Sequence, residues 1–232
     1  MTTVILLRHG RTTANAGGIL AGWTPGVQLD EAGAAQVSAV GERLAKIPLA
    51  AIVSSPLERC RQTAEAVAAG RGLEVRDDDR LGEARYGDWT GRAIEELVKE
   101  PLWKVVQQHP SAAVFPGPEG EGLANTQARA VAAVRSWNAS LAPDAVWLAC
   151  SHGDVIKAIL ADALGLHLDQ FQRIVVDPAS ISVVTYTETR PFVLRVNDTG
   201  GDVSALVPPP RKRRRRTASS DAVVGGGAGA TV

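Results

Sequence analysis

Strand-like and helix-like segments alternate along residues 1–200, and this alternation constrains the fold more than any other feature of the sequence. Runs rich in β-branched and aliphatic residues are typical of strands, and they occupy 3–8, 50–55, 145–150, 180–187 and 190–197. Amphipathic stretches typical of helices occupy 31–46, 56–69, 122–141 and 154–164. The alternation predicts a three-layer α/β/α fold, in which helices cover a mostly parallel central sheet.

Composition divides the 232 residues into two parts. We expect residues 1–200 to form one domain, because 201–232 is dense in Gly, Pro and charge, has no hydrophobic periodicity and is typical of a disordered tail. The domain carries 19 Lys and Arg against 23 Asp and Glu, a net charge of −4, whereas the tail contains "RKRRRR" at 211–216. We expect this basic run to stay solvated rather than to bind nucleic acid, since no aromatic residue that could stack on bases accompanies it.

Other features concern the compartment and the partners. No apolar run approaches the roughly eighteen residues of a membrane span, and Met1 leads directly into a strand. Cys60 and Cys150 are too few for a disulfide framework and lack the spacing of metal ligands. We therefore expect a cytoplasmic protein without a metal or another cofactor, and a homodimer is compatible with the sequence.

Charged and imidazole side chains follow three of the predicted strands. Arg8 and His9 end the first strand in "LLRHGRTTAN", and "CSHGD" places His152 directly after the third. In "SSPLE" after the second strand, Ser55 is the expected N-cap of a helix that begins at Pro56, with Arg59 in its first turn. Because ligands of open α/β sheets bind outside the carboxyl ends of the strands, two arginines and two histidines should converge there. This combination is typical of a phosphate site, since guanidinium groups match phosphoryl oxygens.

Five segments in order resemble the histidine phosphatase superfamily, in the branch similar to cofactor-dependent phosphoglycerate mutases and their phosphatase relatives. They are "LLRHGRTTAN", "QLDEAGAAQ", "SSPLERCRQTAE", "GEARYGDWTG" and "CSHGDVIKAIL", within about residues 3 to 190. The resemblance implies a nucleophile, a proton donor and a phosphate pocket. These roles fall on His9 as nucleophile, Glu83 as proton donor, Arg8, Arg59 and His152 as the pocket, and Asn15 as a further phosphate contact.

The chemistry expected from these residues is metal-independent hydrolysis of a small phosphorylated metabolite. A neutral imidazole is a competent nucleophile toward phosphorus, and a desolvated Glu83 could protonate the leaving alkoxide and later activate water. A cysteine-based phosphatase would need an arginine six positions after its cysteine, where this chain has Ala66 and Ile156. "EVRDDDRL" follows too weak a strand for an aspartate nucleophile, so Asp77 and Asp79 are expected in a solvated turn.

Two alternatives use the same residues: a phosphoglycerate mutase-type enzyme, and a catalytically inactive protein that binds phosphorylated ligands. The segment 86–120, which would cover the pocket, favours hydrolysis. It carries Arg92, Lys99 and Lys104 against five acidic residues, a net charge of −2, and this is a poor clamp for a bisphosphorylated intermediate. An inactive protein would not need Glu83.

Some positions leave the substrate open. Arg11 stands where many relatives carry Glu or Gln, so it is either a binder of a second anionic group on the substrate or a surface arginine. "GPEGEG" at 117–122 also departs from the Gly-Gly-Glu of many relatives. Four aromatic residues could line the pocket or belong to the core: Trp23, Trp89, Trp103 and Phe115.

A chain ending at Gly200 should keep the activity and the melting temperature of the full chain, because nothing after that position shows the periodicity of a core-forming element. Thermal melts and turnover of a chromogenic phosphate ester, measured side by side on both lengths, check this. A markedly lower melting temperature would move the domain boundary into the tail.

Overall fold

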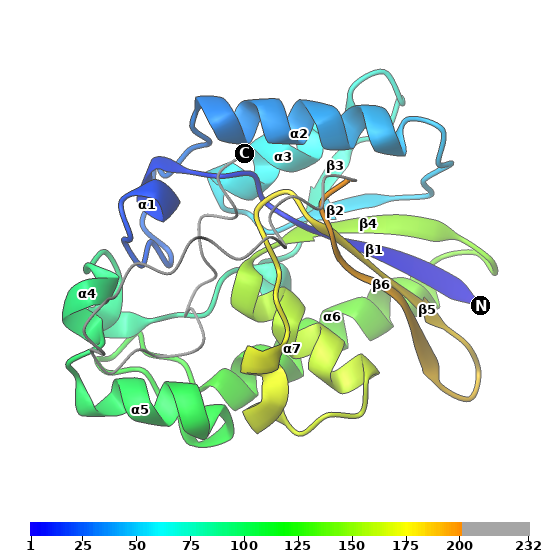
Figure 1. Ribbon diagram of the computed structural model, residues 1–232. Helices are drawn as coiled ribbons and strands as arrows, with labels where there is room; N and C mark the ends of the chain where they lie inside the picture. The colour runs from blue at the N-terminus through cyan, green and yellow to red at the C-terminus, as the bar shows by residue number, and fades with distance from the viewer. Residues whose placement is uncertain (201–232) are drawn as a thin grey trace, which may run out of the picture.

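The computed structural model describes residues 1–200, so the predicted tail at 201–232 lies outside the described part of the chain. A six-stranded sheet in the order β3-β2-β4-β1-β5-β6 forms the centre of the molecule (Figure 1). Four strands are parallel, β1 (Thr2–Arg8), β2 (Ile52–Ser54), β3 (Val75–Asp77) and β4 (Val146–Ser151). The strands β5 (Ile181–Tyr186) and β6 (Pro191–Asp198) continue the sheet antiparallel. The prediction of a mostly parallel α/β sheet is confirmed.

Helices cover the sheet on two sides (Figure 1). On one face lie α2 (Glu31–Leu44) and α3 (Glu58–Ala68), and on the other lie α6 (Leu123–Ser140) and α7 (Gly153–Ala163). Beyond the carboxyl ends of the parallel strands lie α1 (Thr13–Ala16), α4 (Ile94–Leu97) and α5 (Pro101–Gln108). Residues 1–200 also contain four short 3₁₀ helices: η1 (Asp79–Leu81), η2 (Gly87–Trp89), η3 (Pro110–Ala112) and η4 (Leu168–Arg173). None of the helices within residues 1–200 is long and apolar enough to cross a membrane.

The burial of β1 on both faces fixes the register of the central strands of the sheet. Val4 and Leu6 are fully buried against the core beneath α6 and α7, whereas Ile5 and Leu7 pack toward α2 and α3. Each such side chain contributes about 1.5–3 kcal/mol when it leaves water. Since successive residues face opposite layers, a slip of one residue would exchange the two sets, and the register is therefore strongly specified. This register pairs Leu7 with Cys150 and Arg8 with Ser151.

The predicted start of the second helix is wrong by two residues. The helix α3 begins at Glu58 with Leu57 as its N-cap, and no side chain caps it. The hydroxyl of Ser55 lies 2.8 Å from Nε2 of His152, which is 97 residues further along the chain. The same hydroxyl accepts from the N–H of Leu57 at 3.3 Å, so Ser55 combines one local and one long-range hydrogen bond instead of capping the first turn of α3.

The strand β3 was not expected. It has only three residues, of which Arg76 and Asp77 are exposed, so it lacks the apolar run that marks a strand in sequence. Pairing with β2 nevertheless makes it the edge of the sheet. Asp77 forms an ion pair with Arg61 of α3, so it lies on this edge rather than in a free turn.

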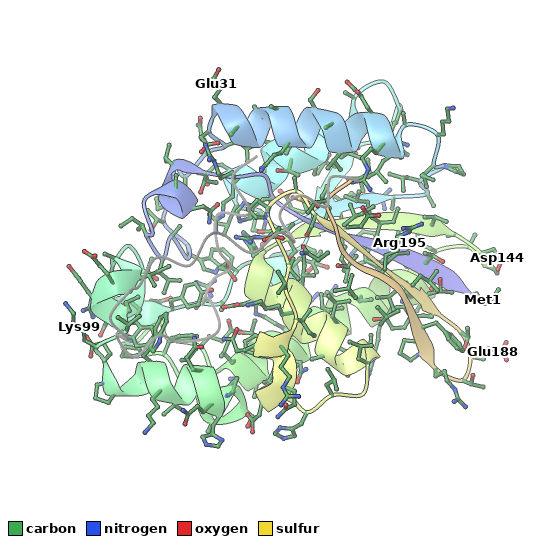
Figure 2. All side chains as sticks on the ribbon, in the orientation of Figure 1. Met1, Glu31, Lys99, Asp144, Glu188 and Arg195 are labelled. Carbon is green, nitrogen blue, oxygen red and sulfur yellow. The ribbon has the colours of Figure 1, made fainter. Side chains whose placement is uncertain are left out.

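The segment between η1 and α6 contributes a large part of the core. Trp89, Trp103 and Phe115 are buried in the same hydrophobic cluster, so these three aromatic residues belong to the core rather than to a pocket lining. Trp23 differs, because it is only partly buried. Lys99 and Lys104 of this segment are exposed, and Lys99 lies at the periphery of the molecule (Figure 2).

Candidate active site

His9 follows the last residue of β1, at the carboxyl edge of the sheet. Its Nδ1 lies 2.8 Å from the carbonyl oxygen of Gly10, and since a carbonyl only accepts, Nδ1 must carry the proton. In the neutral ring the lone pair then sits on Nε2. Burial and the nearby Arg59 and Arg8 hold the pKa of His9 well below its usual value, so the ring is neutral at physiological pH.

Gly10 permits the close packing that holds His9 in place. A Cβ at this position would lie 2.7 Å from the carbonyl oxygen of Gly33 and 2.7 Å from Cγ2 of Val37, both in α2. Its N–H also donates to Oγ1 of Thr63 at 3.1 Å. Glycine at position 10 therefore lets the chain turn directly beneath α2 with His9 facing the pocket.

His152 stands next to His9 because β4 is paired with β1. The centroids of the two rings are 5.2 Å apart in an edge arrangement. Nδ1 of His152 lies 3.3 Å from Nη2 of Arg59 and 3.8 Å from Oε2 of Glu83. Because the guanidinium only donates, Nδ1 accepts, and Nε2–H donates to Ser55. Burial and then Arg59 lower the pKa of His152 well below its usual value, so this ring is neutral as well.

Two buried guanidinium groups complete the pocket. Arg8 donates from Nη1 to the carbonyl of Val176 at 2.7 Å, and Arg59 donates from Nη2 to the carbonyl of Gly22 at 2.8 Å. Nη1 of Arg59 is buried and has no hydrogen-bond partner within residues 1–200. A buried donor of this kind costs free energy until an acceptor occupies the site. Burial lowers the pKa of Arg8, and the pocket is suited to an anion that neutralises both groups.

Glu83 is the carboxyl group of the pocket. It lies in the loop between η1 and η2 and is only 4% exposed. The N–H of Ala84 donates to Oε1 at 3.0 Å, which leaves Oε2 facing His152. Burial, followed by the negative charge of Asp154, raises the pKa of Glu83 to about 7. The group can therefore both give up and take back a proton near neutral pH.

Arg8, His9, Arg59, Glu83 and His152 thus come together, whereas the side chains of Arg11 and Asn15 are engaged elsewhere. Arg11 pairs with Asp30, with 2.8 Å between Nε and Oδ2. Oδ1 of Asn15 accepts hydrogen bonds from the N–H and the hydroxyl of Thr12 at 3.1 and 2.9 Å, which closes a capping box on α1. The amide NH₂ of Asn15 takes no part in that box.

The contacts that Cys60, Arg85 and Trp23 make near these residues were not predicted from the sequence. Sγ of Cys60 lies 3.4 Å from Nε2 of His152, beside the hydroxyl of Ser55. The guanidinium of Arg85 lies 4.2 Å from the centre of the Trp23 ring, whose Nε1 donates to the carbonyl of Glu83 at 2.6 Å. Cys60 and Arg85 lie within two of the quoted motifs, but the motifs alone give no signal for these contacts. Within residues 1–200, no three His, Cys, Asp or Glu side chains gather as metal ligands.

Comparison with known proteins places this geometry in a family. Residues 4–199 match the histidine phosphatase superfamily (branch 1). Phosphoserine phosphatase 1 of Hydrogenobacter thermophilus is 31% identical over 207 residues, which cover 86% of this chain and 93% of that protein. A probable phosphoglycerate mutase GpmB of Salmonella arizonae is 32% identical over 210 residues, 89% of this chain and 95% of the relative.

Solved structures agree with these relatives. YhfR of Bacillus stearothermophilus has a TM-score of 0.79 at 29% identity, covering 85% of this chain and 98% of that one. The mycobacterial glucosyl-3-phosphoglycerate phosphatase, solved with VO3, has a TM-score of 0.75 at 29% identity, covering 84% of this chain and 98% of that one. With two histidines, two arginines and a glutamate at the carboxyl edge of its sheet, this chain belongs to the histidine phosphatase superfamily.

Proposed function

We propose that the chain hydrolyses phosphomonoesters of small metabolites through a phosphohistidine formed on Nε2 of His9. The observation that carries this proposal is the hydrogen bond from Nδ1 of His9 to the carbonyl of Gly10. It fixes the tautomer whose free lone pair lies on Nε2, beside two buried guanidinium groups. A neutral imidazole held in this way is a ready nucleophile for phosphorus.

In the first step, Nε2 of His9 attacks phosphorus and the ester P–O bond breaks. Arg8 and Arg59 lie where they can oppose the charge on the equatorial oxygens, and Nη1 of Arg59 gains the acceptor that it lacks. Glu83 gives its proton to the departing alkoxide, so the alcohol leaves neutral and the carboxylate remains.

In the second step, the Glu83 carboxylate takes a proton from water as the oxygen attacks phosphorus. The N–P bond breaks, and inorganic phosphate leaves. The imidazole of His9 becomes neutral again, and Glu83 is reprotonated for the next cycle. A carboxyl group whose pKa lies at about 7 suits both directions of proton transfer.

The charged residues of the segment 86–120 favour water over a second phosphoryl acceptor. In the segment 86–120, Arg92 is already engaged by Glu96 at 3.7 Å and Glu100 at 3.0 Å. Lys99 and Lys104 are exposed, and Lys99 lies at the periphery of the molecule (Figure 2). These cations are poorly placed to hold the second phosphate of a bisphosphorylated intermediate, which supports hydrolysis.

We also propose that residues 1–200 form the whole catalytic domain and that the enzyme works in the cytoplasm without a metal. The two cysteines, Cys60 and Cys150, are buried and unpaired with each other, which suits a reducing compartment. The pocket supplies its positive charge through Arg8 and Arg59, a role that a metal ion serves in other phosphatases.

His9→Ala should abolish turnover, because it removes the nucleophilic nitrogen. Brief incubation of the unaltered enzyme with a ³²P-labelled ester, quenched without acid and in the presence of EDTA, should give an acid-labile phosphoryl group on His9. His167→Ala, at an exposed histidine, is the matched control and should retain both label and turnover. Label on a serine, aspartate or cysteine would exclude the phosphohistidine route.

Glu83→Gln should slow an alkyl phosphate far more than an activated aryl phosphate, because a good leaving group needs little protonation. In the unaltered enzyme, kcat/KM for the alkyl ester should fall as the pH rises through about 7, where Glu83 loses its proton. Glutamine does not titrate, so the variant should lack this fall relative to the parent. Equal losses on both esters would remove Glu83 from the role of acid.

Supplied with 3-phosphoglycerate and catalytic 2,3-bisphosphoglycerate, the enzyme should release phosphate and form little 2-phosphoglycerate. The reason is that the acidic segment 86–120 does not retain the bisphosphorylated intermediate. Both products can be followed in one reaction by ³¹P NMR. Isomer formation faster than phosphate release by orders of magnitude would identify a mutase instead.

A further inference from the structure

We propose that Arg129 is a positioning residue for Glu83, acting through the peptide unit that joins Glu83 to Ala84. This inference rests on the proposed role of Glu83 as proton donor. Arg129 lies on α6, behind the loop that carries Glu83, and holds the main chain rather than the carboxyl itself.

The guanidinium of Arg129 bonds three main-chain carbonyls, one in η1 and two in the loop that follows it. Nη1 donates to the carbonyls of Arg80 at 2.7 Å and Gly82 at 2.8 Å, and Nη2 donates to that of Glu83 at 3.0 Å. Residues 82–85 belong to no helix or strand, and Tyr86 pairs with Gly120 only through an isolated β-bridge. The planar guanidinium of Arg129 therefore fixes the main chain of this loop through side-chain hydrogen bonds.

Glu121 binds the guanidinium of Arg129 and also forms hydrogen bonds to the main chain of Arg85. Its carboxylate receives Nε of Arg129 at 2.7 Å on Oε1 and Nη2 at 2.9 Å on Oε2, a bidentate pair. Glu121 also exchanges hydrogen bonds with Arg85, whose N–H donates to Oε2 at 3.2 Å and whose carbonyl accepts from the Glu121 N–H at 2.8 Å. Hydrogen bonds therefore hold the main chain before Glu83, at Gly82, and after it, at Arg85.

The link to chemistry is the geometry of a single peptide plane. The carbonyl of Glu83 accepts from Nη2 of Arg129 and also from Nε1 of Trp23 at 2.6 Å, so both of its lone pairs are used. The N–H at the other end of the same planar unit belongs to Ala84, and it donates to Oε1 of Glu83 at 3.0 Å. Fixing the carbonyl therefore fixes the donor that orients the carboxyl, and with it the direction of Oε2.

A residue that only stabilised the fold would lower activity toward every substrate alike. A residue that aims the acid should matter only where the leaving group needs a proton. The test therefore compares an alkyl and an aryl phosphate in Arg129→Lys, which keeps the charge but cannot span three carbonyls and Glu121 together. Arg135→Gln is the control, since Arg135 lies on the same helix and is exposed.

We expect kcat/KM of Arg129→Lys to fall about tenfold or more for the alkyl ester and less than about threefold for the aryl ester. We expect Arg135→Gln to leave both unchanged. In the background of Glu83→Gln, Arg129→Lys should cause little further loss on the alkyl ester, because the group that it aims is already gone. Equal losses on both esters, or a full additional loss in the double variant, would overturn the proposal.

Trp23→Phe provides a second route if Arg129→Lys does not fold cooperatively. It removes only the other donor to the Glu83 carbonyl and should give the same selectivity against the alkyl ester, with a smaller loss. Equal losses of Trp23→Phe on both esters would also overturn the proposal. If Glu83→Gln itself shows no difference between the esters, then the proposed acid role fails rather than the role of Arg129 alone.

Discussion

The parallel pairing of β1 with β4 is the interaction on which the site depends. Its register places Arg8 opposite Ser151, so His9 and His152 leave the sheet side by side. The register is held by β1, whose alternate side chains are buried in two separate clusters. Burial of the apolar side chains of β1 in the middle of the sheet therefore sets the spacing of two imidazole rings at its edge. Both rings are buried, but neither belongs to the two hydrophobic clusters.

The charges of the site support the proposal that it binds a phosphoryl group. Arg8 and Arg59 are almost wholly removed from water, and the nearest carboxyl, Glu83, is protonated over part of the neutral range. Glu83, Asp154 and Asp177 act electrostatically on Arg8, and a phosphoryl group would add the acceptor that Nη1 of Arg59 lacks within residues 1–200. Burial first, and then the charges of Arg59 and Arg8, hold the pKa of both histidines well below its usual value, and a protonated His9 would have no lone pair for attack. The two arginines proposed to bind the anion therefore also help to keep the proposed nucleophile neutral.

The sequence predicted the parts of this arrangement that local patterns encode. Strand ends followed by Arg8–His9 and by His152 identified the edge of the sheet, and the capping residues brought Arg59 close to its true position. Prediction failed where a long-range partner decides the outcome. Ser55 looks like a helix cap but bonds a histidine 97 positions away, and β3 exists only because β2 offers it an edge. Arg129 left no signal because its partners are main-chain carbonyls, which have no residue identity.

The groups of the pocket come from four distant segments, around positions 8, 59, 83 and 152, and all of them are buried. No fragment of the chain can carry them, and no partly folded form brings them together. The rate of turnover of a chromogenic ester is therefore proportional to the concentration of fully folded protein. During refolding from denaturant, recovery of activity would therefore report the assembly of all four segments, whereas far-ultraviolet circular dichroism would report secondary structure alone.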